Sequence, residues 1–233
     1  MQVVMIGPFM LKLSLLMLAA AAAAGYAVPF FLTKRLEPDR RKPLMDDLVT
    51  ALLIGILVWK FSVIVFDPHS VIRSPRSLLY FTGGTEGLIL GAIIGAMIPV
   101  YKCLKYRKPW AAYANAALAW LAAGYGIWNL LRVFFDGGGA SSIASAVVSA
   151  AVVTFQLRRT DRMFSGYHFV VSVLWLSIGW FAASLLGGAP DEAWWLGFTG
   201  MQLCLIAAMI LAFSVKVTVD AKRKSNDTKP PII

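Results

Sequence analysis

Seven long apolar blocks, separated by short polar segments, constrain this chain more than any other feature of its sequence. Each block has about 18 to 24 residues, enough for an α-helix to cross roughly 30 Å of hydrocarbon. Of the 233 residues, 59% are hydrophobic and only 15% are charged, whereas soluble domains have about a quarter charged residues. The pattern predicts an all-α, polytopic membrane protein with seven transmembrane helices. The predicted spans are 9–32, 48–66, 78–101, 110–131, 140–157, 167–186 and 194–217.

The basic residues are divided unequally between the two ends of these spans. Most of the 22 lysines and arginines lie in the loops after the first, third and fifth spans and in the C-terminal segment. The opposite side carries Arg73, Arg76 and Arg132. Because positively charged loops are retained in the cytoplasm, the N-terminus is predicted outside and the C-terminus inside. This orientation, with attraction to anionic lipid, accounts for the net charge of +10, so no nucleic-acid partner is expected.

The spans leave no residues over for a soluble domain. Residues 1–217 are therefore predicted to form one transmembrane helical domain, and 218–233 a basic, disordered cytoplasmic tail. The apolar N-terminal run ends in small residues, as a signal peptide does, but its first cation, Lys12, comes late, which favours an uncleaved first span. Cys103 and Cys204 form no CxxC pair, and no motif for a metal or a cofactor is present.

Glycine recurs every fourth residue in the third span. Gly83, Gly87, Gly91 and Gly95 would therefore follow one another along one face of a helix. Small residues on such a face allow the backbone of a neighbouring helix to come close. The spacing predicts close helix packing, and the alternative is a cleft in which a lipid chain lies against the bare backbone.

Several stretches together resemble the bacterial prolipoprotein diacylglyceryl transferases, and they occur in that family's order over nearly the whole chain. The family opens with Ile-Gly-Pro before its first span, begins its second span with acidic residues, and carries Gly-Gly-Leu-Ile-Gly in its third. Its last span has Gly-Gln followed by Leu-Ser. The matching stretches are "VVMIGPFMLKLSLLMLAAAAAAGY", "DDLVTALLIGILVWKFSVIVFD", "SPRSLLYFTGG", "EGLILGAIIG" and "TGMQLCLIAAMILA".

The resemblance implies a multi-pass protein of the bacterial cytoplasmic membrane. Members of this family transfer the diacylglyceryl group of phosphatidylglycerol to the lipobox cysteine of a prolipoprotein, without a cofactor. Such chemistry needs a group that helps form the thiolate and cations that stabilise the departing phosphate.

The sequence departs from the family where this chemistry is carried. The position of the family's histidine falls either in a short deletion between Thr85 and Glu86 or on Thr82, depending on the alignment. The sixth span, "LSIGWFAASLL", lacks the family's arginine and glutamate. No catalytic residue can therefore be carried over from the family's histidine motif.

Two further motifs are partly kept. Of the family's Gly-Arg-x-Gly-Asn-Phe stretch, Asn129 corresponds to the asparagine, but Gly126 or Ile127 stands at the arginine position. The arginine of the second span appears as Lys60, which keeps the charge and loses the bidentate phosphate geometry.

Glu86 and Lys60 are ionisable residues inside predicted spans, where charge is costly and is usually functional or paired. The sequence offers these two residues, and no others, as candidates for catalysis, and neither belongs to a recognised catalytic motif. Glu86 is either a protonated or Lys60-paired group that holds two spans together, or a working acid. Lys60 either extends to the membrane surface or meets a lipid phosphate.

The outer face is predicted to hold an anionic lipid headgroup. Its cations could converge there, or each could contact ordinary lipid separately. His69 is expected in solvent, and His168 lies at the inner end of its span, on the wrong side for the family's chemistry. The predicted headgroup-binding residues are Lys60, Arg73, Arg76, Asn129 and Arg132.

Three functions remain in competition. The first is a pseudoenzyme, a degenerate relative that binds phospholipid such as phosphatidylglycerol, a prolipoprotein or another membrane protein. The second is an active, divergent transferase in which Glu86 replaces the histidine, and Lys60 with Arg132 holds the phosphate. The third is a small transporter or accessory membrane subunit, which is disfavoured because the spans show no inverted repeat of interrupted helices.

Overall fold

A computed structural model of the chain describes residues 3–6, 9–34, 36, 38–73, 84–187 and 197–227. These residues are almost entirely helical. Six of their helices are long and apolar enough to cross a membrane, and Leu16–Leu32 forms a shorter apolar helix. The predicted helical, multi-pass architecture is confirmed to this extent, while the count of seven spans and their orientation stay predictions.

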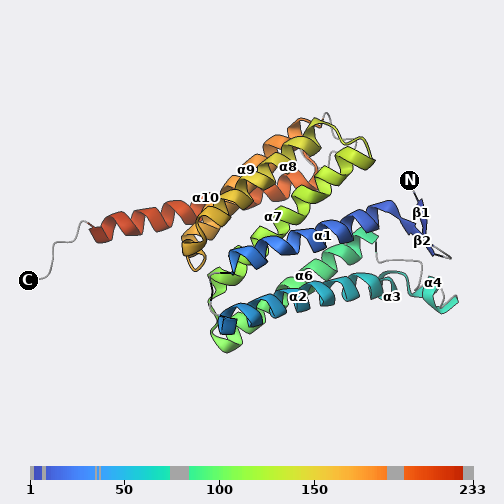
Figure 1. The fold of residues 1–233 in the computed structure, drawn as a ribbon, viewed down its shortest axis with the longest axis horizontal. Helices are drawn as coiled ribbons and strands as arrows, with labels where there is room; N and C mark the ends of the chain where they lie inside the picture. The colour runs from blue at the N-terminus through green and yellow to red at the C-terminus, as the bar shows by residue number, and fades with distance from the viewer. Residues whose placement is uncertain are drawn as a thin grey trace, which may run out of the picture. The chain divides into compact units, whose positions relative to one another are not determined.

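The helices α7, α8 and α9 lie within a few residues of the predicted spans 110–131, 140–157 and 167–186 (Figure 1). The strands are β1 (Val3–Ile6) and β2 (Phe9–Lys12). The helices are α1 (Leu13–Leu32), α2 (Pro38–Phe61), α3 (Val63–Phe66), α4 (Pro68–Arg73), α6 (Gly84–Tyr106), α7 (Trp110–Phe135), α8 (Ala140–Arg158), the short η1 (Thr160–Arg162), α9 (Gly166–Leu185) and α10 (Gly200–Asp227).

The first predicted span begins too early. Residues 9–12 are not helical but form β2, which pairs antiparallel with β1, with Ile6 opposite Phe9 and Val3 opposite Lys12. β-branched residues such as Val3 and Ile6 favour extended backbone. The helix α1 therefore starts at Leu13.

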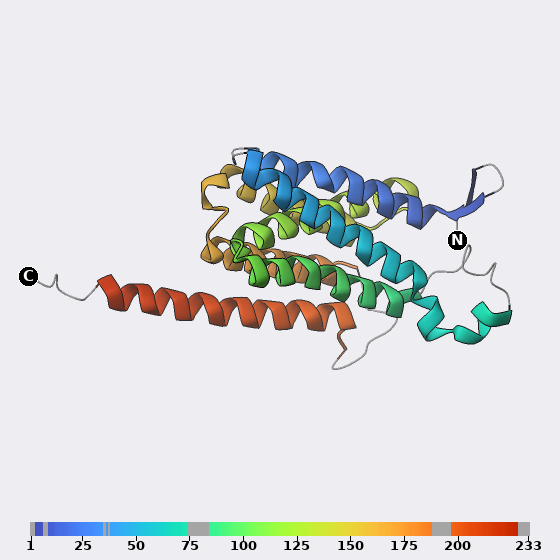
Figure 2. The ribbon, with the colours of Figure 1, turned by 90° about the horizontal axis from the view of Figure 1, so that it is seen from below.

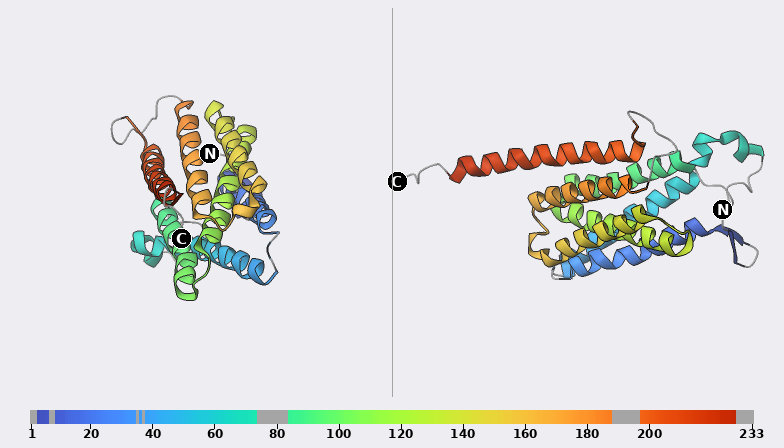
Figure 3. Two further views of the ribbon diagram at one scale, coloured as in Figure 1. Left: turned by 90° about the vertical axis from the view of Figure 1, so that its left-hand side faces the viewer. Right: turned by 90° about the horizontal axis from the view of Figure 1, so that it is seen from above.

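The last helix ends later than predicted. α10 continues past 217 to Asp227, and Figures 2 and 3 show it as one continuous helix. Alanine, lysine and arginine in "DAKRK" are good helix formers, and extending an existing helix avoids the cost of nucleation. Over residues 218–227 the structure thus differs from the expected disordered tail. Residues 74–83, 188–196 and 228–233 lie outside the described part.

The chain divides into two compact units, and the boundary falls inside α7. One unit comprises residues 36–113 and the other comprises 1–35 together with 114–233. In the first, here called the 36–113 unit, α2 packs along α6 (Figure 1). In the second, α9 packs against both α8 and α10. This unit, which also includes residues 1–35 and therefore α1, is called the 114–233 unit below. The single transmembrane domain expected for residues 1–217 stays a prediction.

An apolar cluster forms the centre of the 114–233 unit. Leu118 and Ala122 of α7 pack with Val152 of α8 and Leu176 of α9. α1 joins α7 through an indole, since Trp120 Nε1 donates to the carbonyl oxygen of Ala22 at 2.8 Å. The glycines of the two helices also meet there, because a Cβ on Gly25 would lie 2.9 Å from the Gly124 nitrogen. The apolar cluster therefore joins α7, α8 and α9, and the contacts at Trp120 and Gly124 attach α1 to α7.

Candidate functional site

The glycine face of α6 lies directly against α2. A Cβ added at Gly95 would lie 2.9 Å from the carbonyl oxygen of Ala51, and additions at Gly87 and Gly91 would clash more severely. Only glycine therefore permits this separation of the two backbones. Gly83 lies outside the described residues. The facing pairs are Gly87 with Ser62, Gly91 with Gly55, and Gly95 with Ala51.

Side-chain hydrogen bonds fix the end of this helix pair at which the candidate charges lie. Trp59 Nε1 donates to the carbonyl oxygen of Gly84 at 3.1 Å, and the Ser62 hydroxyl donates to the Trp59 carbonyl at 2.8 Å. Lys60, in the last turn of α2, is half-buried, whereas Glu86, in the first turn of α6, is exposed. The structure thus places the two residues at the same end of the α2–α6 pair. A direct pairing between them stays a prediction.

The residues expected to share a lipid headgroup belong to different units. Lys60 and Arg73, the last residue of α4, are in the 36–113 unit. Asn129 and Arg132 of α7 are in the 114–233 unit. Asn129 is buried and its amide donates to the Tyr125 carbonyl oxygen at 2.9 Å, while Arg132 is exposed. Arg76 lies outside the described residues, so their convergence on one headgroup stays a prediction.

A further charged cluster surrounds Asp47, at the opposite end of α2 from Lys60. The Asp47 carboxylate is buried and accepts three hydrogen bonds. Lys102 Nζ lies 2.5 Å from Oδ1, and Lys108 Nζ lies 2.7 Å from Oδ2. The Tyr113 hydroxyl donates to Oδ2 at 2.8 Å. Because all three donors serve one carboxylate, Asp47 ties α6, the following turn and the start of α7 to α2.

Local backbone geometry brings these donors to Asp47. Arg107, directly after α6, has a φ of 49°, a left-handed conformation that ends helices. The amide of Lys108 then donates back to the Cys103 carbonyl oxygen at 3.2 Å. This reversal of the chain turns the Lys108 side chain toward α2 and lets α7 begin at Trp110.

Sequence reasoning did not single out this cluster. Asp47 entered only as one of the acidic residues that open the second span, and the lysines entered only as orientation signals. The available signal was an acid directly before a predicted span, on the side of the membrane where the loops are basic. A buried carboxylate is tolerated chiefly when it is paired, so its partners had to lie in the loop at that membrane surface. Three donors on one buried carboxylate are consistent with a structural role that holds these segments together.

The two histidines lie in different units of the described structure. His168 is buried in the first turn of α9, where its ring stacks on Phe155 with centroids 5.1 Å apart. Arg159 lies over the Phe155 ring at 5.2 Å. His69 is exposed in α4. Within the described residues, no three His, Cys, Asp or Glu side chains are grouped to hold a metal ion.

Comparison with protein-family models, curated proteins and solved structures found no match to this chain. The resemblance to the prolipoprotein diacylglyceryl transferases therefore rests on the sequence stretches alone, and it stays a prediction.

Proposed function

We propose that this chain is a pseudoenzyme of the bacterial cytoplasmic membrane, related to the prolipoprotein diacylglyceryl transferases. In this proposal seven spans run N-out and C-in, and the protein binds an anionic phospholipid such as phosphatidylglycerol without transferring its diacylglyceryl group. The observation that carries the proposal is the ordered resemblance along nearly the whole chain, combined with loss of the family's histidine and arginine positions.

The surroundings of the remaining ionisable groups support a role without catalysis. Glu86 is exposed in the first turn of α6 and is not enclosed by other protein groups. His168 packs on Phe155. The Asp47 carboxylate accepts hydrogen bonds from three donors. The unequal distribution of lysine and arginine between loops supports the orientation.

A complementation experiment tests the absence of transfer. The chain is expressed in a bacterial strain depleted of its own transferase, and lipoproteins are followed by labelled palmitate. We expect no labelled lipoprotein, whereas an authentic transferase expressed to the same level restores labelling. Restored labelling by this chain that is lost in Glu86→Gln would overturn the proposal and establish the divergent-transferase alternative.

Lipid binding is tested separately on the purified protein. We expect phosphatidylglycerol to be retained over a zwitterionic lipid when the protein is extracted from mixed vesicles. Lys60→Gln with Arg132→Gln should lower this retention, and Lys216→Gln, at the predicted inner end of α10, serves as the matched control. Equal retention of both lipids would contradict the headgroup site, and capture of a prolipoprotein instead would identify the other predicted partner.

Orientation is tested by cysteine labelling in intact cells. Single cysteines placed at Arg40, Lys105 and Arg159 should all be protected from an impermeant reagent. Labelling at Lys105 with protection at Arg40 would overturn the number of spans between them.

A further inference from the structure

The interface between α8 and α9 contains buried polar groups that the proposed function does not use. The two helices pack antiparallel, side by side in Figure 1. Trp180 Nε1 donates to the Ser149 hydroxyl at 3.0 Å, and the rings of Phe155 and His168 stack at 5.1 Å. These pairs fix the register, because residue numbers rise along α8 as they fall along α9.

This register places Gln156 and Ser172 in the same layer. Gln156 lies seven residues after Ser149, which is about two helical turns on the same face. Two turns back from Trp180 along α9 lead to the level of Ser172. Both side chains are on the buried faces of their helices, with Gln156 1% exposed and Ser172 0% exposed.

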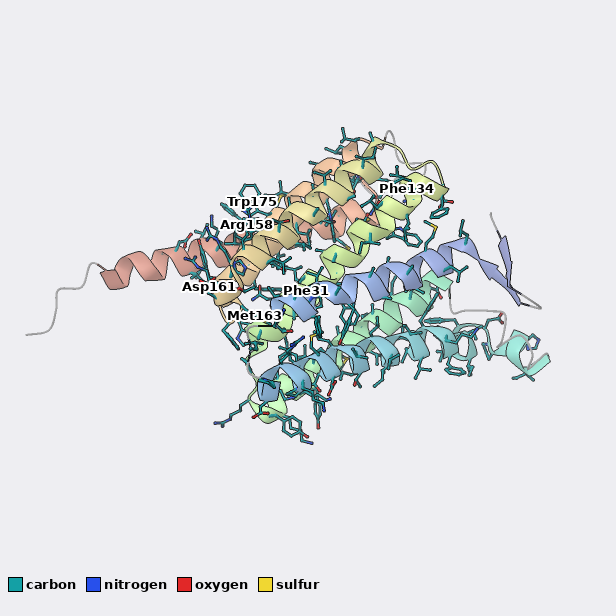
Figure 4. All side chains as sticks on the ribbon, in the orientation of Figure 1. Phe31, Phe134, Arg158, Asp161, Met163 and Trp175 are labelled. Atoms are coloured by element: carbon teal, nitrogen blue, oxygen red, sulfur yellow. The ribbon has the colours of Figure 1, made fainter. Side chains whose placement is uncertain are left out.

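The layer is closed along the bundle on both sides. Toward the middle of the helices, Val152 and Leu176 belong to the apolar core with Leu118. Toward the α8–α9 turn, Asn115 of α7 donates to the Met163 carbonyl oxygen at 2.9 Å, and Met163 is 2% exposed. Figure 4 labels Met163, Arg158 and Asp161 around this turn.

The polar atoms of this layer have unused hydrogen-bonding capacity. Gln156 Nε2 and Oε1 and Ser172 Oγ have no hydrogen-bond partner among the described residues. An amide and a hydroxyl left unpaired in an apolar interior cost several kcal/mol, and lipid offers no compensating donors. Together the two side chains offer both donors and acceptors, and both are uncharged.

We propose that Gln156 and Ser172 form a buried binding site for a small neutral molecule that donates and accepts hydrogen bonds, with water as its occupant. One water molecule can accept from Gln156 Nε2 and donate to Ser172 Oγ, which gives each of these two atoms a partner. Both side chains are uncharged and buried, which favours a neutral occupant over an ion or a lipid headgroup. The site hydrates the α8–α9 interface and is independent of any lipid bound elsewhere.

Hydroxyl-radical labelling of the full-length protein in detergent tests this site directly. Radicals formed from buried water oxidise neighbouring methionine even where bulk solvent has no access. Met163 should be oxidised several-fold faster than Met17, which is comparably buried at 3% exposed in α1. Gln156→Leu with Ser172→Ala should reduce Met163 oxidation to the rate of Met17. Equal rates at the two methionines in the unaltered protein would overturn the proposal without any variant.

Thermal unfolding gives a second, independent readout. If one water bridges both side chains, Gln156→Leu and Ser172→Ala should each lower Tm, and the double variant should lower it by less than the sum of the two. If the groups are simply unpaired, replacing either by an apolar side chain removes a penalty and raises Tm. A rise in Tm for either single variant would therefore overturn the proposal.

Discussion

The α2–α6 pair and the α8–α9 pair achieve close packing in opposite ways. α6 presents glycines to α2, so that backbone meets backbone, as at Gly91 and Gly55. α8 has three serines on its buried face, Ser142, Ser145 and Ser149, and Ser149 faces α9. At this interface the contacts are between side chains, as in the hydrogen bond from Trp180 to Ser149.

This difference matters because burial of apolar surface drives helix association weakly in lipid, where packing and interhelical hydrogen bonds remain. A backbone interface depends on shape alone and has no room to adjust. A side-chain interface can adjust, because rotamers shift and polar groups can exchange partners. The two pairs should therefore respond differently to equivalent substitutions.

The largest expected effect is at Gly91. Gly91→Leu should destabilise the protein by about 3 kcal/mol or more, since the new side chain meets the Gly55 backbone and can only force the helices apart. The measurement is the unfolding free energy of the purified protein in mixed micelles. Ala92→Leu, at the exposed neighbouring position, is the matched control and should change stability little. Similar losses for both variants would contradict the close α2–α6 contact.

The next largest loss of stability is expected at Asp47, whose polar contacts differ from the glycine packing in the rest of the α2–α6 pair. Asp47→Asn removes the charge that holds Lys102 and Lys108, and should cost about 2 kcal/mol, as for hydrogen bonds to a charged group. The loss should shrink in high salt. Asp46→Asn, one residue earlier and exposed, is the control. A loss at Asp46 equal to that at Asp47 would show that the buried cluster contributes nothing.

Gly179 provides the counterpart of Gly91 in the α8–α9 pair. A Cβ there would meet the side chain of Val148 rather than backbone. Gly179→Ala should therefore cost about 1–2 kcal/mol by overpacking, and adding Val148→Ala should recover part of that loss. Gly91 faces the backbone carbonyl of Gly55. A backbone group cannot be shortened by substitution, so no second change should recover the loss at Gly91. Purely additive losses for Gly179→Ala and Val148→Ala would remove this distinction.

The sequence predicted the helical elements well where hydropathy alone determines them. The spans at 110–131, 140–157 and 167–186 lie within a few residues of α7, α8 and α9. It was wrong near the two ends of the chain, where β1 pairs with β2 and where α10 continues to Asp227, and at α2, which begins at Pro38 and not at residue 48. At these places the helix and strand preferences of individual residues, and not hydropathy, determine where an element begins or ends. A prediction based on hydropathy alone therefore misplaces these boundaries.

The candidate site was less accessible from sequence for a different reason. The glycine spacing identifies a face of α6 but does not say which helix it meets. The cluster at Asp47 joins residues that are 55 to 66 positions apart, and only the left-handed turn at Arg107 brings them together. The unused hydrogen bonds of Gln156 depend in the same way on the register of two helices, which no single span reveals.

The smallest expected effect is at the hydrogen bond that crosses the α8–α9 pair. Trp180→Phe keeps most of the ring and removes the donor to Ser149, so it should cost about 1 kcal/mol. Ser149→Ala should cost a similar amount, and the double variant should cost little more than either single variant. Trp175→Phe is the matched control, because Trp175 lies on the same helix and is 61% exposed. If the two substitutions at the interface proved additive, the Trp180–Ser149 bond would contribute nothing, and packing alone would hold this layer of α8 to α9, as it does where Gly91 of α6 meets Gly55 of α2.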